Sequence, residues 1–251
     1  MNHRITGTTM PVLEFQLESN DAVISEAGEL SWMTPNVQMT THTQFAGGGG
    51  IFGAIKRVAG GGSLFMTEYR AMGGAGELAF ATRVPGQILP VDISANSEFM
   101  VHRHGFLCGT DGVQLSVGFQ QSLGAGIFGG SGFLLQKVSG QGQAWLELSG
   151  EVVVRDLAPG QTLLVHPGHV GAFQSSVNFQ ITMVRGIRNL LFGADSLFLA
   201  ALSGPGRIWL QTLPISRLAQ QIFEYMPQQS GRTAEAGVLG GIVGSVLDNM
   251  R

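Results

Sequence analysis

The sequence predicts an all-β protein that contains three copies of one strand-rich repeat, followed by a C-terminal helix. The first supporting observation is a Gly-x-Gly turn between apolar segments, which occurs three times at a nearly constant interval. The second is composition, because glycine accounts for 38 of 251 residues whereas charged residues amount to only 12%. The third is that the apolar segments are short and bounded by Gly or Pro, which is typical of strands in a sandwich or barrel.

The three turns lie in segments that align without gaps, at residues 72–80, 138–146 and 202–210. Their second glycines are 66 and then 64 residues apart. Two apolar residues followed by a glycine precede each turn, and in the first copy a longer loop, about residues 54–63, separates this pattern from the turn. Coincident patterns at one period indicate an internal triplication.

The turn glycines and the aromatic residues at equivalent positions are the structural anchors of the predicted repeats. Glycine permits a positive φ, which a tight hairpin between two strands requires. The aromatic residues are expected to pack in the core or between repeats. The anchors are Gly74, Gly76, Gly140, Gly142, Gly204, Gly206, Phe52, Phe128, Phe192, Trp145 and Trp209.

Apolar segments flank each turn and predict a hairpin in every copy. The strands before the turns are expected at 64–69, 133–138 and 197–202, and those after the second and third turns at 144–148 and 207–211. Pro85-Gly86 and Pro159-Gly160 mark further turns, and another short apolar segment follows each of them. The chain therefore contains many short strands at close spacing.

One helix is predicted after the third copy, with Pro214 at its start and Pro227 at its end. Its apolar face consists of Ile215, Leu218, Ala219, Ile222 and Phe223. A small apolar tail, residues 236–247, would be about 18 Å long as a helix, which is too short to cross a hydrocarbon layer of ~30 Å. Its overlapping Gly-x-x-x-Gly spacings suit close helix packing. The tail is interpreted first as a buried or frayed terminal helix, and contact with a partner or a membrane surface is the alternative.

Several segments resemble a known family. They are Ile51-Phe-Gly with Lys56-Arg57, residues 60–65, the central segment 128–133, and Ser203-Gly-Pro-Gly-Arg-Ile-Trp-Leu-Gln-Thr-Leu-Pro214. Together they resemble the mitochondrial biogenesis family of the altered-inheritance-of-mitochondria protein 24 type and its bacterial homologues. The resemblance extends over about residues 15–213.

The resemblance implies three TRAP-like repeats, each similar to a subunit of the tryptophan RNA-binding attenuation protein. Each repeat would be a short double-stranded β-helix or β-sandwich unit, and the three would surround a pseudo-threefold axis. They would span about 15–92, 93–163 and 164–213, and together form the region 1–213. The rest, 214–251, would hold the helix, a polar linker and the tail. The resemblance implies no catalytic residues; mitochondrial members of the family are linked to inner-membrane organisation.

The charge balance is slightly acidic, with 14 Lys and Arg against 17 Asp and Glu. Nucleic-acid binding needs clustered cations beside stacking aromatic residues, and the best cluster here is Lys56-Arg57. RNA binding, which the fold analogy suggests, is therefore kept only as a second alternative. Because the first residues show no signal-peptide pattern, we expect a cytoplasmic protein. The single Cys108 rules out an internal disulfide.

His102-x-His104 is the pattern that points to metal chemistry, because alternate residues of a strand face the same side, as in the metal sites of cupins. No Glu follows at the short spacing of such sites. Glu98 precedes the pair instead, and His166 and His169 lie in a separate turn. We therefore predict no metal and no cofactor, and retain His102 and His104 as weak candidates.

The sequence contains neither a Gly-x-Ser-x-Gly elbow nor a phosphate-binding P-loop. It therefore predicts a non-enzymatic scaffold or interaction protein that forms a homo-oligomer, in which neighbouring subunits cover edge strands and apolar surface. The sequence identifies no protein partner, and it leaves peripheral membrane contact through residues 236–247 open. The alternative is a cupin-like protein that binds a metal or a small ligand through His102 and His104.

Overall fold

The computed structural model describes residues 1–44, 64–121, 133–183 and 198–226. Contacts divide the chain into two units, 1–217 and 218–251, and all described strands belong to the first. Three predicted anchors, Phe52, Phe128 and Phe192, lie outside the described residues, as does the tail 236–247.

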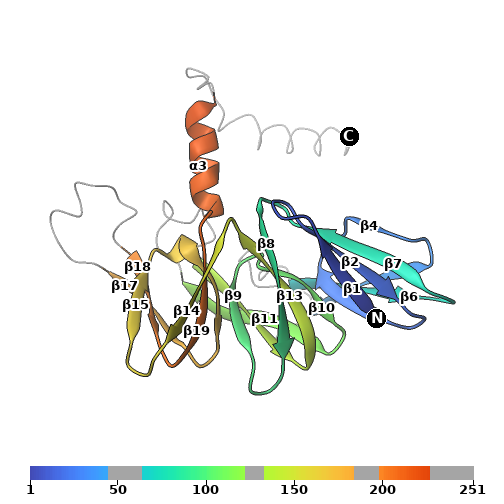
Figure 1. Cartoon of the computed structure of the whole chain (residues 1–251), viewed down its shortest axis with the longest axis horizontal. Helices are drawn as coiled ribbons and strands as arrows, with labels where there is room; N and C mark the ends of the chain where they lie inside the picture. The colour runs from blue at the N-terminus through green and yellow to red at the C-terminus, as the bar shows by residue number, and fades with distance from the viewer. Residues whose placement is uncertain (45–63, 122–132, 184–197, 227–251) are drawn as a thin grey trace, which may run out of the picture. The chain divides into compact units, whose positions relative to one another are not determined.

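A short first strand, β1 (Asn2–Thr6), precedes three sets of six strands (Figure 1). The first set is β2 (Val12–Leu17), β3 (Ala22–Glu26), β4 (Trp32–Met33), β5 (Val37–Gln44), β6 (Leu64–Ala71) and β7 (Gly76–Ala81). The second set is β8 (Gly86–Ile93), β9 (Phe99–His102), β10 (Phe106–Thr110), β11 (Val113–Gln121), β12 (Phe133–Gly140) and β13 (Gly142–Ser149). The third set is β14 (Val152–Leu157), β15 (Thr162–Val165), β16 (Val170–Gln174), β17 (Asn178–Met183), β18 (Phe198–Ser203) and β19 (Gly206–Gln211).

The strands form four antiparallel sheets whose order follows one rule. Two six-stranded sheets have the orders β5-β6-β3-β10-β13-β8 and β11-β12-β9-β16-β19-β14, and in each the last three strands come from the set that follows the first three. The two remaining sheets, β1-β2-β7-β4 and β15-β18-β17, contain only one such half each. Each six-stranded sheet is therefore shared between successive sets, and the two ends of the series are half-sheets.

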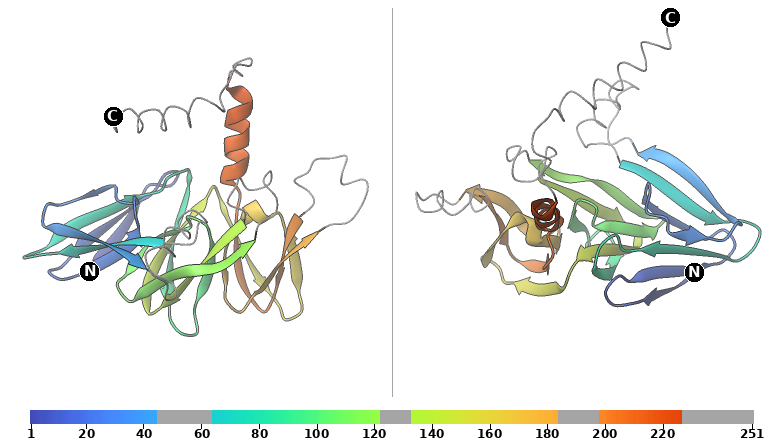
Figure 2. Two further views of the ribbon diagram at one scale, coloured as in Figure 1. Left: turned by 180° about the vertical axis from the view of Figure 1, so that it is seen from behind. Right: turned by 90° about the horizontal axis from the view of Figure 1, so that it is seen from above.

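Three buried apolar clusters lie between successive sheets. The first core contains Leu13, Phe15, Tyr69, Phe80 and Trp145 among others. The second core includes Phe99, Phe106, Val138 and Leu146, and the third includes Leu135, Phe173, Leu202 and Ile208. Figures 1 and 2 show the first set in blue and the third in orange at opposite ends of the first unit, with the second set between them. Both faces of each six-stranded sheet carry core residues, because each sheet separates two cores.

The predicted Gly-x-Gly turns connect β6 to β7, β12 to β13 and β18 to β19. Gly140 has a φ of 96°, and a Cβ atom placed there would lie 2.3 Å from the carbonyl oxygen of Gly112. Gly206 has a φ of 147°, and a Cβ atom placed there would lie 2.6 Å from Oγ of Ser176. At these two positions glycine is required both by the backbone conformation and by the approach of neighbouring atoms.

The predicted all-β class with one C-terminal helix is confirmed. The helix α3 spans Ile215–Tyr225, directly after Pro214, and no helix in the described part of the chain is long and apolar enough to cross a membrane. A short 3-10 turn, Pro167–His169, separates β15 from β16. The strands β15 and β4, near the two ends of the series, belong to separate sheets.

Candidate functional site

A cavity of about 380 Å³ opens where the second and third sets adjoin. Its lining comes from the segment before β8, the end of β9, the start of β12, the end of β13 and the chain before α3. The lining residues are Arg83, Val84, His102, Arg103, His104, Phe133, Leu134, Glu147, Ser149, Pro167, Gly168, Val170, Gln211, Pro214, Ile215 and Ser216. The wall of the cavity contains both apolar side chains, such as Phe133 and Leu134, and charged side chains, such as Arg83 and Glu147.

The charged part of the wall is organised around Arg83. Its guanidinium Nη1 lies 3.1 Å from Oε1 of Glu29, and its Nε lies 3.4 Å from Oε2 of Glu147. The backbone N–H of Arg83 also donates to Glu147 Oε1, at 2.8 Å. Both carboxylates are buried, whereas the Arg83 side chain is 39% exposed. One partly exposed cation thus links the loop after β3 to β13 of the next set.

Burial governs the protonation of these carboxyl groups. Loss of solvent raises the pKa of Glu29 to about 7, because the attraction of Arg83 offsets only part of the cost and the neighbouring Glu147 and Glu26 add repulsion. Burial also raises the pKa of Glu147 and of Glu26, although Arg83 lowers both. The pKa of about 7 therefore lets Glu29, beside Arg83, change its charge near neutral pH.

His102 and His104, the predicted candidates, do not converge on one point. His102 is half-buried, and its ring nitrogens face two carbonyl oxygens, Nδ1 at 2.7 Å from Arg103 O and Nε2 at 3.2 Å from Glu147 O. His104 lies in a turn with a φ of 64°, and its Nδ1 is 4.0 Å from Glu26 Oε2. Burial lowers the pKa of both histidines, that of His104 to about 4 with a contribution from Arg83. Neither ring is directed at a shared ligand.

Glu98, His166 and His169, which the sequence offers near the His102-x-His104 pattern, have partners of their own. His166 and His169 lie around the 3-10 turn with their rings 5.9 Å apart, and Nδ1 of His169 is bound to the carbonyl oxygen of Gln211 at 2.7 Å. Glu98 pairs with Lys137 at 2.9 Å. Across the described ranges, no three His, Cys, Asp or Glu side chains are close enough to hold a metal ion.

The site offers hydrogen bonds within the protein rather than a reactive group. The backbone N–H of Ser149 donates to Oε1 of Gln211, whose Nε2 donates to the carbonyl oxygen of Gly168. Cys108 is fully buried, and burial raises the pKa of its thiol well above the usual range. A thiol in this state is a poor nucleophile at neutral pH. The polar groups therefore hold neighbouring strands together.

Sequence reasoning missed the three residues at the centre of this cluster, Glu29, Arg83 and Glu147. A signal was present, because Glu147 is a charged residue inside the apolar strand Ala144-Trp-Leu-Glu-Leu148, in a chain with few charges. A charge at such a position is normally paired. Its partner could not be inferred, since Arg83 lies 64 residues away in the sequence.

Replacing Glu29 with glutamine is expected to make the protein more stable at pH 8 and to leave it nearly unchanged at pH 5. The folded pKa of about 7 lies above the unfolded value near 4.5, so the stability linked to protonated Glu29 is present below 4.5 and is lost as pH rises through 7. At ~1.4 kcal/mol per pKa unit, the difference approaches ~3 kcal/mol.

The measurement is chemical denaturation of both proteins between pH 5 and 8. His102 and His104 act in the opposite direction, because their lowered pKa values favour the folded state as pH rises. Both histidines are present in the natural protein and in Glu29→Gln, so their effects cancel when the two free energies of unfolding are subtracted at each pH. Glu151→Gln, at an exposed carboxyl bound to Gln87, is the control. A difference between Glu29→Gln and the natural protein that does not grow with pH would contradict the prediction.

Comparisons with known proteins give a consistent result. The sequence profile of the family described as "Mitochondrial biogenesis AIM24" matches residues 3–213. The uncharacterized protein M6_Spy0233 of Streptococcus pyogenes serotype M6 is 27% identical over 223 residues, which is 88% of each chain. The crystal structure of protein SPYM3_0169 from Streptococcus pyogenes superposes with a TM-score of 0.71 at 24% identity, and the match covers 90% of this chain and 99% of that one.

Proposed function

Since the chain belongs to the mitochondrial biogenesis AIM24 family, we propose that it is a non-enzymatic scaffold or interaction protein that works as an assembly of several copies. The single observation behind this proposal is the pair of half-sheets at the two ends of the strand series. Unpaired edges carry rows of free N–H and C=O groups, and proteins cover such edges with other chains or protect them.

The recurring sheet order supports a finer architecture as part of the same proposal. The pairing of β4, β7 and β2 is repeated by β10, β13 and β8, and again by β16, β19 and β14. We take the three sets as TRAP-like repeats; the boundaries expected from the sequence, near 15–92, 93–163 and 164–213, place β8 and β14 with the preceding set. Each repeat then completes its sheet with strands of the next repeat, and the last repeat has no successor in its own chain.

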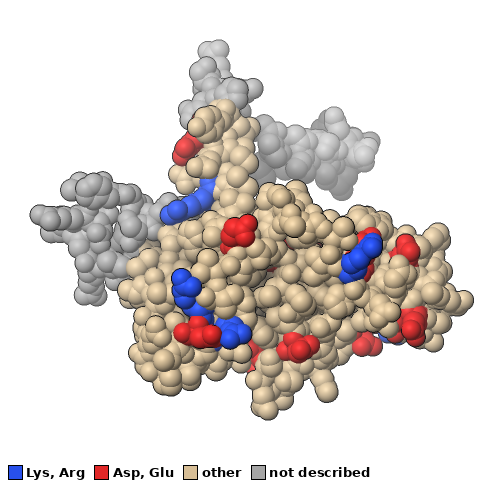
Figure 3. All heavy atoms as spheres, viewed as in Figure 1, with Lys and Arg blue, Asp and Glu red and all other residues tan. Residues whose placement is uncertain are grey.

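The surface and the cavity also favour an interaction protein over an enzyme. On the face shown in Figure 3, acidic and basic side chains are scattered over a surface formed mostly of uncharged residues. Two charged residues of the cavity wall, Arg83 and Glu147, bind each other, and Arg83 also binds the buried Glu29. A weakly charged surface favours contact with other subunits by apolar burial.

Light scattering coupled to size-exclusion chromatography tests the proposal. The subunit has a mass of 26.5 kDa, and we expect a particle of at least twice this mass at micromolar concentration. The full chain is used, because the described residues do not include the tail. A monomer under these conditions would contradict the proposal.

A second candidate function is the binding of a small amphipathic acid in the cavity. The observation in its favour is Arg103, which lines the cavity beside Phe133 and Leu134 and has no hydrogen bond or ion pair from its side chain to another described residue. Octanoate is a suitable probe. We expect it to raise the Tm of the natural protein and to have less effect on Arg103→Gln; equal shifts, or none, would exclude this site.

A further inference from the structure

We infer that copies of this protein join head to tail, with β15 of one copy hydrogen-bonded to β4 of the next. The two half-sheets then form one sheet that has the six equivalent strands of the existing sheets and, at its edge, β1 as a seventh. This inference rests on the proposed function and specifies its interface. The other occupant for these edges would be a strand of a different protein. A second copy is favoured because the chain already contains this junction twice, between β3 and β10 and between β9 and β16.

The two existing junctions fix the register of the third. Each set has one residue that lies three positions after the second glycine of its Gly-x-Gly turn: Ala79, Trp145 and Trp209. Their paired neighbours on the next strand are equivalent to one another, and these are Trp32, Cys108 and Ala172, in the same order. On the other strand, Met100 and Leu164 are equivalent. They pair with Lys137 and Ala201, each of which lies three positions before the first turn glycine.

At the second junction, Phe173 pairs with Met100, and Ala172 pairs with Val101. Transferring these pairs to the open ends places Met33 opposite Leu164 and Trp32 opposite Val165. The paired strands of both existing junctions are antiparallel, so β15 of one copy and β4 of the next would be antiparallel as well.

Side-chain burial supports this register from the β15 end. Ile24 is the equivalent residue of the first set, because it pairs with Gly109 at the first junction as Met100 pairs with Phe173 at the second. It packs in the second core, which belongs mainly to the second set. Met100, in the second set, packs against the third core. Leu164 is the equivalent residue of the third set; the described part of its chain contains no fourth core, and Leu164 is 55% exposed. The inferred neighbour supplies the missing core, because Leu164 would contact its first core beside Met33.

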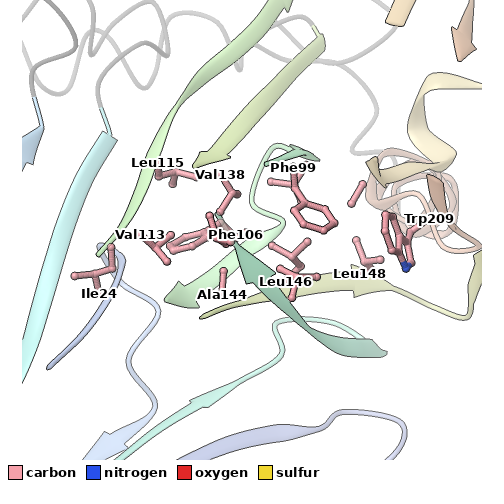
Figure 4. Close-up of a cluster of buried hydrophobic side chains, with 14 of the residues drawn as sticks. Ile24, Phe99, Phe106, Val113, Leu115, Val138, Ala144, Leu146, Leu148 and Trp209 are labelled. Carbon is pink, nitrogen blue, oxygen red and sulfur yellow. The ribbon is translucent and has the colours of Figure 1, made fainter. Parts of the chain in front are cut away.

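The β4 end gives independent support. Trp145 lies in the first core and Trp209 in the second, so each tryptophan packs into the core of the preceding set. Figure 4 shows both contributions to the second core, with Ile24 beside Val113 at one side and Trp209 near Phe99 at the other. The first set has Ala79 in place of these tryptophans, but its paired neighbour Trp32 is 49% exposed.

Trp32 and Ala79 face the same side of their sheet, since directly paired residues do so. Met33, the next residue, packs against the first core, so Trp32 faces away from that core. In the inferred assembly, the sheet face that carries Trp32 covers the third core of the preceding copy. Trp145 and Trp209 cover the first and second cores in the same way. The half-exposed Trp32 and Leu164 are thus the two halves of one interface, which is heterologous and generates a ring or an open chain.

Cysteine cross-linking between two differently tagged proteins tests the inference. One carries Met33→Cys and the other Leu164→Cys; the natural Cys108 is fully buried and does not interfere. After mixing, dissociation and reassembly, mild oxidation is expected to give a reducible dimer that contains both tags. Two controls are included. In the first, a protein with Val154→Cys, at an exposed strand position, is mixed with the Met33→Cys protein in place of Leu164→Cys. In the second, circular dichroism confirms that each variant is folded.

The outcomes separate this inference from the proposed function. A mixed dimer at several times the level of the Val154→Cys control supports the inference. An assembly seen by light scattering without this cross-link overturns the inference and leaves the proposed function standing, whereas a monomer overturns both. A double variant with both cysteines tests closure within one chain: an intrachain disulfide at monomer mass, without mixed dimers, would also overturn the inference.

A disruptive variant provides a second measurement. Leu164→Lys places a charge on the open edge, where it would have to enter the apolar core of the neighbour. We expect the assembled mass to fall to the subunit mass with unchanged circular dichroism. Val154→Lys, on β14, is expected to keep the assembled mass; a similar loss with both variants, or none with Leu164→Lys, contradicts the inferred interface.

Discussion

Replacing Trp145 with alanine is expected to lower the free energy of unfolding by about 3–5 kcal/mol, the range for removing a buried aromatic side chain. Trp145 is fully buried, and its ring lies 4.8 Å from that of Phe15 and 5.0 Å from that of His3, both roughly edge-on. It belongs to β13 of the second set, yet it fills the first core. The substitution therefore leaves a cavity between two sets.

The measurement is chemical denaturation monitored by circular dichroism. Tryptophan fluorescence is unsuitable because the substitution removes one of the fluorescent residues. Met39→Ala, at a side chain that is 49% exposed on β5, is the control and should change stability by under ~1 kcal/mol. Trp145→Phe is informative as well, since the indole Nε1 of Trp145 is buried without a hydrogen-bond partner in the described structure. We expect it to cost much less than alanine; equal losses for both would contradict the cavity explanation.

Replacing Arg83 with methionine is the second change with a large expected effect, a loss of about 2–3 kcal/mol near pH 8. Breaking a buried ion pair typically costs ~3–5 kcal/mol, and the 39% exposure of Arg83 reduces this figure. The loss arises because Glu29 and Glu147 remain buried as unpaired carboxylates. Methionine preserves most of the side-chain volume, so the effect is mainly electrostatic.

The loss is expected to shrink as pH falls, which identifies its cause. Without Arg83 the pKa of Glu29, already about 7, rises further, so protonation removes the unpaired charge below neutral pH. Denaturation at pH 5 and pH 8 checks this. Arg4→Met, at an exposed pair with Glu14, is the control for losing a surface cation. A loss for Arg83→Met of the same size at both pH values would show that packing, not charge, is responsible.

The strands and turns were predictable from the sequence because their signals are local. A hairpin at 138–146 needs only two glycines and alternating apolar residues, and the structure has β12 and β13 on either side of Gly140 and Gly142. The helix was predictable for the same reason, with Pro214 just before its first residue. Periodicity and turn chemistry act over a few residues, which a single sequence displays directly.

The candidate site was not predictable, because its partners are far apart in the chain. His102 and His104 have the spacing of two ligands on one face of a strand, but β9 ends at His102 and His104 lies in the following turn with a positive φ. The alternation that the prediction assumed therefore stops between them. Glu147 and Arg83 meet only because β13 and the segment before β8 adjoin in the folded sheet.

The sharing of sheets between sets has a consequence for how the protein unfolds. Ile24 and Trp145 anchor neighbouring sets in each other's interiors, so a set cut out of the chain would lose contacts on both sides. Folding energy in such an array resides in the contacts between neighbours as much as within each unit. The three sets should therefore melt together in one cooperative transition, and a cut at a set boundary would yield fragments that must find each other before either becomes native.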